Sequence, residues 1–164
     1  MLAEKCFIIV HGDQMVLTIL LLAGVICWRG GSPGFWILAW PGTAVHELCH
    51  WIVGLVTLGQ PDQINIMPTP PKDGEQVLGS VTFNNIGWWN ALPIGIAPLM
   101  AFPLALMIAN ATTFDWTWGS ALMVWILASV VSQCWPSSTD WRIAFKHPVG
   151  VMLYGALFYM IISK

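Results

Sequence analysis

The segment 35–58, FWILAWPGTAVHELCHWIVGLVTL, is apolar and carries the pentapeptide HELCH at residues 46–50. In a helix, side chains four residues apart project from one face, so His46 and His50 can bind a single metal ion. Glu47 then lies within reach of a metal-bound water molecule. This spacing is the zinc hydrolase signature HExxH. It predicts two imidazole ligands and Glu47 as the general base for a water that attacks a carbonyl group.

A buried polar cluster, with both histidines hydrogen-bonded to neighbouring backbone, is the alternative to a metal site. The apolar surroundings favour the metal, because an ionisable side chain in hydrocarbon costs about 2.5 to 3.5 kcal/mol on insertion scales. Three such side chains close together need a partner such as a cation. We therefore predict one Zn²⁺ per chain, bound in part by His46 and His50.

The composition is typical of an integral membrane protein. Of the 164 residues, 57% are hydrophobic and only 9% are charged, a balance unsuited to a solvated surface. The formal net charge is −2 without a basic run, which argues against nucleic acid as a partner. The four cysteines have no CxxC spacing and predict no disulfide framework. We expect residues 1–164 to form a single domain in the lipid bilayer.

Apolar segments predict an all-α polytopic membrane protein with about five transmembrane helices, some kinked or partial. The expected spans are residues 7–28, 35–58, 88–108, 117–135 and 149–162. Pro41 and Gly42 predict a kink or a restart of the second helix, with Thr43 as a candidate N-cap. Pro93, Pro98 and Pro103 predict an irregular third helix.

The polar loop 59–86 contains two alternating runs, residues 63–67 and 79–83, which predict a small membrane-associated β element after the second helix. Two interpretations stay open. The loop is an ordinary connection, or it presents a strand edge that holds an extended substrate by main-chain hydrogen bonds.

The distribution of positive charge predicts the orientation in the membrane. Five spans place four cations on one side and two on the other: Lys5, Lys72, Arg142 and Lys146 against Arg29 and Lys164. The positive-inside rule then makes the N-terminus and the loop 59–86 cytoplasmic.

A catalytic zinc site usually has three protein ligands and an open fourth position, so a third ligand is needed. Asp140 is the first candidate because it follows a helix break at Pro136. It can instead serve as an N-cap or pair with Arg142. His147 is the main rival, and Asp115 is a more distant one because it belongs to the opposite membrane face.

Three asparagines, Asn84, Asn85 and Asn90, cluster at the start of the third predicted span. They are candidates for binding a substrate backbone or an oxyanion through their amide donors. Helix caps and interface contacts are the alternative roles.

These motifs together resemble the site-2 protease family of intramembrane zinc metalloproteases. Members of that family carry HExxH in one span, a β element after it, a small-residue-Pro step in the next span, and a later motif that reads Asn, two residues, Pro, then Leu-Asp-Gly. The corresponding positions here are residues 46–50, 59–86, 97–99, Gln133, Pro136 and Asp140. Gln133 stands in place of the family's Asn, and Thr139 and Trp141 replace its Leu and Gly.

The resemblance implies hydrolysis of a peptide bond in or near a transmembrane segment of a membrane protein or peptide substrate. It assigns the third zinc ligand to Asp140. A non-catalytic membrane protein that binds or senses a metal is the alternative. A fourth protein ligand, such as His147 or Cys49, would favour that alternative, because it would close the position that a catalytic site keeps open.

Overall fold

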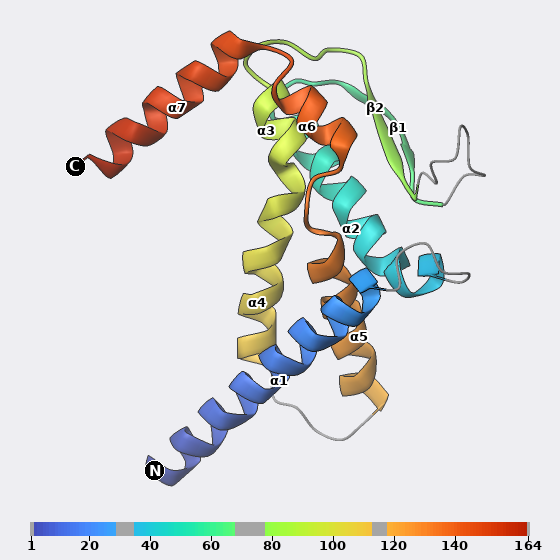
Figure 1. The fold of residues 1–164 in the computed structure, drawn as a ribbon, viewed down its shortest axis with the longest axis vertical. Helices are drawn as coiled ribbons and strands as arrows, with labels where there is room; N and C mark the ends of the chain where they lie inside the picture. Colours follow the sequence, from blue (N-terminus) through green and yellow to red (C-terminus); the bar gives the residue numbers. More distant parts are fainter. Residues whose placement is uncertain (1, 29–34, 68–77, 113–117, 164) are drawn as a thin grey trace.

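The computed structural model describes residues 2–28, 35–67, 78–112 and 118–163, with side chains from residue 15 onward. Within these ranges the chain is mostly helical, with one pair of short strands (Figure 1). The elements are α1 (Leu2–Trp28), α2 (Phe35–Val56), β1 (Pro61–Asn65), β2 (Ser80–Phe83), α3 (Ala91–Ile96), the 3₁₀ helix η1 (Ala97–Met100), α4 (Ala101–Ala111), α5 (Trp118–Gln133), α6 (Ser138–Ala144) and α7 (Pro148–Ile162).

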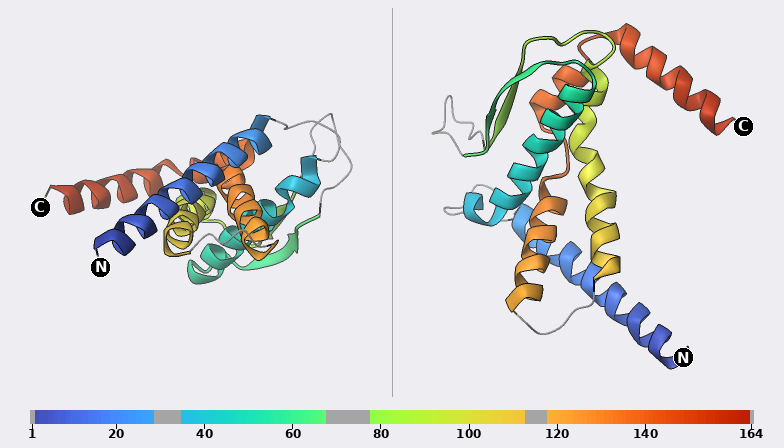
Figure 2. Two further views of the ribbon diagram at one scale, coloured as in Figure 1. Left: turned by 90° about the horizontal axis from the view of Figure 1, so that it is seen from below. Right: turned by 180° about the vertical axis from the view of Figure 1, so that it is seen from behind.

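The core lies where α5 packs against α1, α2 and α4 (Figure 2). Six of the twelve buried core residues are alanines, whose small side chains let helix backbones approach closely. The buried alanines are Ala23, Ala39, Ala101, Ala105, Ala109 and Ala128. α2 approaches α5 closely, since a Cβ on Gly42 would lie 2.1 Å from the carbonyl oxygen of Ser129. This close approach fixes the position of α2 relative to the end of α5.

The second predicted helix forms, but the restart predicted at Pro41 and Gly42 is wrong. α2 continues through Pro41, and the Thr43 hydroxyl donates to the carbonyl of Ala39 at 3.2 Å, so Thr43 is an interior residue and not an N-cap. Pro41 has no N–H and so omits one hydrogen bond of α2. Next to it, α5 offers a bond to the backbone, because the Gly42 N–H donates to the Ser129 hydroxyl at 2.8 Å. α2 thus runs as one helix from Phe35 through the HELCH turn to Val56, and the alternative of a kink at Pro41 stays a prediction.

The third predicted helix is irregular, as its prolines predicted. α3, η1 and α4 follow one another from Ala91 to Ala111, and the α-helical pattern tightens to 3₁₀ at residues 97–100. Pro98 lies at the start of this tight turn. Because proline has no N–H, it cannot donate to the carbonyl of Ile94 four residues earlier. That carbonyl is left partly available to another donor.

The two predicted strands are confirmed. β1 and β2 pair antiparallel, with Ile64 opposite Val81 and Asn65 opposite Ser80. β1 begins two residues before the run predicted at 63–67. The connection 68–77, which includes Lys72, lies outside the described residues. The strand pair lies beside α2 (Figure 1), so β2 is close to the helix that carries the histidines.

Judged by length and mean hydropathy, one unbroken helical segment of the described ranges, Ala91–Ala111, is suited to cross a membrane. α5 and α6 together qualify as a second, although the chain bends by 55° between them. The apolar helices Met15–Trp28 and Pro148–Ile162 are shorter. α7 extends away from the other helices in the views of Figures 1 and 2. The layout of five spans therefore remains a prediction.

Candidate metal centre and active site

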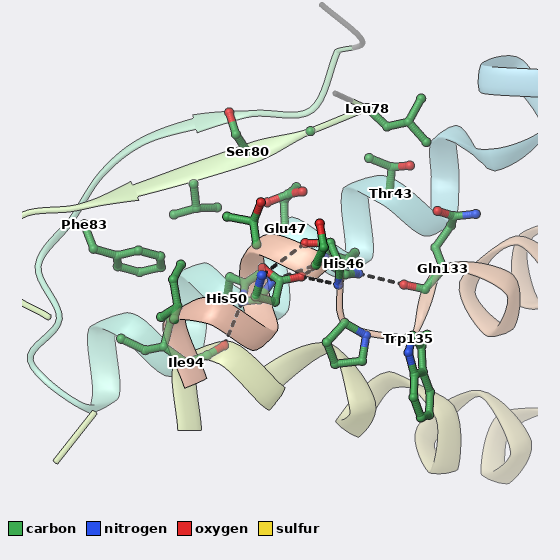
Figure 3. Close-up of a pocket in the computed structure, with 18 residues that line it drawn as sticks. Thr43, His46, Glu47, His50, Leu78, Ser80, Phe83, Ile94, Gln133 and Trp135 are labelled. Atoms are coloured by element: carbon green, nitrogen blue, oxygen red, sulfur yellow. Dashed lines mark hydrogen bonds and ion pairs between the residues drawn. The ribbon is translucent and has the colours of Figure 1, made fainter. Parts of the chain in front are cut away.

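His46 and His50 project from the same face of α2, as the helical spacing predicted. Their Nε2 atoms are 3.1 Å apart, and the ring centroids are 4.9 Å apart. His50 is 4% exposed, so its ring lies almost entirely inside the protein. The two imidazoles therefore converge on one point beside α2 (Figure 3).

Asp140 completes a three-residue cluster with these histidines. Its two carboxylate oxygens lie at 3.2 Å from the imidazoles, Oδ2 from Nε2 of His46 and Oδ1 from Nε2 of His50. The ligand atoms of all three residues lie within 4.8 Å of one another. A residue from α6 thus meets two residues from α2 that are about ninety positions earlier in the chain.

A capping box holds Asp140 in place. The Ser137 hydroxyl accepts a hydrogen bond from the Asp140 N–H at 3.2 Å, and Oδ2 of Asp140 accepts one from the Ser137 N–H at 2.6 Å. This reciprocal pair starts α6 immediately after the bend that follows α5. Ser137 is therefore the N-cap, and Asp140, at the third position of α6, is not the N-cap considered from the sequence. Asp140 contributes to the capping box and also belongs to the three-residue cluster.

Backbone carbonyls fix the orientation of both imidazole rings. Nδ1 of His46 lies 2.7 Å from the carbonyl oxygen of Gln133, and Nδ1 of His50 lies 2.8 Å from that of Ile94. A carbonyl oxygen can only accept, so each Nδ1 carries the proton. A neutral ring held in this way presents the lone pair of Nε2 to the cluster. Metal-binding histidines in proteins are commonly held in this way.

Both carbonyls are available because of helix geometry. Gln133 is the last residue of α5, where carbonyls lack partners within the helix, and Pro136 follows the end. Ile94 lies four residues before Pro98, which has no N–H to offer it. Pro98 in η1 and the end of α5 thereby favour the Nδ1–H tautomers of His50 and His46.

The cluster has an excess of electron pairs that a cation would balance. Two Nε2 lone pairs and a carboxylate face one another at 3.1 to 3.2 Å. If one of the two Nε2 atoms took up a proton, the other Nε2 atom would still face an acceptor oxygen of Asp140. Ligands of a tetrahedral zinc ion lie about 3.3 to 3.4 Å apart, given metal–ligand distances of about 2.0 to 2.1 Å. The His46, His50 and Asp140 group therefore fits a metal ion such as zinc in donor type and spacing.

Glu47 lines the same cavity and is 7% exposed. The cavity has a volume of about 770 Å³ and lies between α2, β2 and the segment from Gln133 through α6 (Figure 3). Its walls combine the polar cluster with apolar side chains such as Val81, Phe83 and Ile94. Three residues that could bind a metal ion and the Glu47 carboxylate thus line one cavity.

The three asparagines lie away from this cavity. The amide of Asn90 donates to the carbonyls of Thr57 and Asn85, and its oxygen accepts from the Gly87 N–H. The Asn85 amide donates to the carbonyl of Leu58. Asn84 is joined to the same region through its backbone. The structure uses these residues to connect the end of α2 to the start of α3 and does not bring them to the cluster.

The rival metal ligands are also elsewhere. His147 lines a separate cavity of about 290 Å³ beside Trp88, and Cys49 packs against the apolar core. Asp115 lies outside the described residues. Within the described part of the chain, the cluster consists of three residues and includes no fourth protein ligand.

Some contributors to the site were not predicted from the sequence. The carbonyls of Ile94 and Gln133 carry no side-chain signal, although Pro98 marks the first of them. Ser137 and Asp140 match the pattern of a capping box, which could have been found. Gly79 lies against Glu47 only because of the tertiary fold.

Comparison of the chain with protein-family models, curated protein sequences and solved structures found no match.

Proposed function

We propose that this chain is an intramembrane zinc metalloprotease that hydrolyses a peptide bond in or near a transmembrane segment of a membrane protein or peptide. The observation that carries the proposal is the convergence of two carbonyl-anchored imidazoles and Asp140 beside the Glu47 carboxylate. Three ligands leave the fourth position for water, which is the arrangement of catalytic zinc sites. The resemblance of the motifs to the site-2 protease family agrees with this assignment.

The residues of the chain have separate roles in the proposed reaction. His46, His50 and Asp140 hold the ion, which when bound lowers the pKa of its water toward about 7. Glu47 accepts a proton from the attacking water and delivers it to the nitrogen of the leaving amine. Burial of this carboxylate keeps bulk water from competing for the proton.

β2 is the element best placed to hold a substrate. Ser80, Val81 and Phe83 line the cavity, and β1 covers only one edge of β2. A peptide added at the other edge would be extended, with its backbone held by main-chain hydrogen bonds. A helical segment must be unwound before a water molecule can reach its peptide bond. This assigns the loop 59–86 the role of presenting an unwound substrate.

Exposed apolar surface supports a location in the bilayer. Large apolar side chains project outward from α4 and α7, among them Leu104, Met107, Leu153 and Phe158, each more than half exposed. Such continuous apolar surface marks contact with lipid or a partner. We therefore propose a multi-pass membrane protein with five spans, two of them short, and with the N-terminus and the loop 59–86 on the cytoplasmic side.

The alternative is a membrane protein that binds or senses a metal without turnover. Such a site is usually closed by a fourth protein ligand. Neither His147 nor Cys49 joins the cluster, so the open position favours catalysis.

The variant Glu47→Gln tests the proposed reaction because it removes the proton acceptor and keeps the side-chain shape. We expect it to retain one zinc per chain by elemental analysis and to lose cleavage by about 10²- to 10⁴-fold. The substrates are fluorescence-quenched synthetic peptides with a Leu/Ala transmembrane segment and a central Asn-Pro or Asn-Gly pair, reconstituted with the protein in phosphatidylcholine vesicles.

Glu4→Gln in α1 is the matched control, since it removes the same charge outside the cluster. We expect it to cleave at the wild-type rate. Equal cleavage by wild type and Glu47→Gln would refute the assigned base. A zinc-loaded wild type that leaves every peptide intact would favour the non-catalytic alternative.

A further inference from the structure

Gly79, the residue before β2, lies directly against the side chain of Glu47. A Cβ atom placed on Gly79 would be 2.7 Å from Cγ, 2.8 Å from Oε1 and 3.0 Å from Cδ of Glu47. Such distances are shorter than van der Waals contact between these atoms. Any side chain at position 79 would therefore require Glu47 or the backbone at residue 79 to shift.

Backbone conformation does not explain the glycine. The φ angle of Gly79 lies outside the left-handed region, so an L-residue would meet no such strain there. The space occupied by Glu47 is what excludes a side chain. The contact joins the strand that borders the substrate cavity to the carboxylate that the proposed reaction uses as its base.

We propose that Gly79 is a positioning residue for Glu47. The inference rests on the proposed function and adds a residue to it. The backbone at Gly79 forms a wall beside the Glu47 side chain and limits its rotamers, which keeps the carboxylate in the cavity shared with the metal ligands. A methyl group at position 79 displaces the carboxylate, and a displacement of about 1 Å is enough to cost about 100-fold in rate.

We expect the three proposed metal ligands to keep their positions in Gly79→Ala. His46 and His50 are held by the carbonyls of Gln133 and Ile94, and Asp140 is held by Ser137. None of these anchors belongs to β2. Gly79→Ala should therefore separate proton transfer from metal binding.

The first experiment measures kinetics and zinc content for Gly79→Ala with the quenched peptides. We expect kcat to fall by about 10- to 100-fold, with KM within about threefold of the wild-type value and zinc still at one per chain. Gly155→Ala in α7 is the matched control, because a Cβ there meets no atom within 4 Å. Wild-type kcat in Gly79→Ala would overturn the inference while leaving the proposed function intact.

The second experiment is a thermal double-mutant cycle that needs no activity. Gly79→Ala should lower Tm by about 3 to 10 °C in the wild type, because the added methyl group overpacks against Glu47. In a Glu47→Ala background, where Cγ and the carboxylate are absent, the same substitution should change Tm by less than about 2 °C. Equal losses in both backgrounds would show that Gly79 does not act through Glu47.

The two experiments distinguish the inference from the function on which it rests. Failure of the wild type to cleave any peptide would refute the proteolytic function. The thermal cycle would still report whether Gly79 positions the Glu47 side chain. If Gly79→Ala lowers Tm only when Glu47 is present but leaves kcat unchanged, Gly79 packs against Glu47 without positioning it for the reaction.

Discussion

Single residues set the geometry of the candidate metal site. Asp140 accepts the Ser137 N–H through the same Oδ2 that faces His46. Its carboxylate therefore cannot rotate freely, because turning it would break the cap that starts α6. Helix capping and ligand orientation are properties of one rotamer.

The identity of the third ligand is tested by comparing Asp140→Asn with His147→Ala. An asparagine can keep the cap through its amide oxygen but offers no negative charge to a metal ion. We expect Asp140→Asn to weaken zinc binding by at least about 100-fold in a competition assay with a chelating dye.

His147→Ala should bind zinc like the wild type, since His147 lines a different cavity. Both variants should retain their helical circular dichroism. If His147→Ala loses zinc and Asp140→Asn retains it, His147 and not Asp140 is the third ligand.

Helix interruptions are the elements that make the site possible. The bend between α5 and α6 brings Asp140 back toward α2, and the 3₁₀ turn at η1 exposes the Ile94 carbonyl to His50. Two regular helices in these places would leave both imidazoles without anchors. The prolines therefore act on the site through the backbone bonds that they cannot form.

Pro98→Ala tests this role of a missing donor. The new N–H can bond to the Ile94 carbonyl and draw it away from Nδ1 of His50. We expect zinc affinity to fall by about 10- to 100-fold, as for other losses of a ligand's hydrogen-bond partner. Pro103→Ala, at an exposed position of α4, is the control and should bind zinc normally. Equal affinity of both variants with wild type would contradict the argument.

At the level of elements, the sequence predicted a mostly helical chain, both strands and the irregular third helix, whereas the five membrane spans stay a prediction. Alternation in residues 63–67 and 79–83 predicted both strands, and the three prolines predicted an irregular third helix. The restart at Pro41 was wrong because a tertiary contact, from the Gly42 N–H to Ser129, supports the helix there. No local pattern reports a hydrogen bond between residues that are 87 positions apart.

The candidate site was predictable only in part. The spacing of His46, Glu47 and His50 follows from helix periodicity alone, and the structure places all three at one cavity. The approach of Asp140 was an expectation from the break at Pro136, and the measured 3.2 Å distances agree with it. The asparagines were expected near the substrate, but the structure uses Asn85 and Asn90 in loop hydrogen bonds. Polar composition alone does not reveal which partner an amide will find.

At the scale of the whole molecule, apolar side chains cover much of the surface. Side chains on α7 such as Met152, Phe158 and Tyr159 are about two-thirds exposed or more. In water such a surface would drive association, whereas lipid covers it without further change. The cavity of the cluster lies apart from α7, so α7 serves as membrane contact in the proposed arrangement.

Cysteine labelling tests the arrangement of five spans. In a background with serine at the native cysteines, Gln63→Cys in β1 and Ser163→Cys after α7 are treated with a membrane-impermeant maleimide. We expect labelling from the cytoplasmic face for Gln63→Cys and from the opposite face for Ser163→Cys. Labelling of both from one face would require an even number of spans between them and would refute the layout.

His46 is oriented by a backbone group, the carbonyl of Gln133, and not by the side chain of that residue. Gln133 also lines the cavity. Because the anchor belongs to the backbone, we expect another side chain at position 133 to leave the ring where it is. In the proposed function, position 133 is thus a place where substrate preference can change while His46 keeps its orientation.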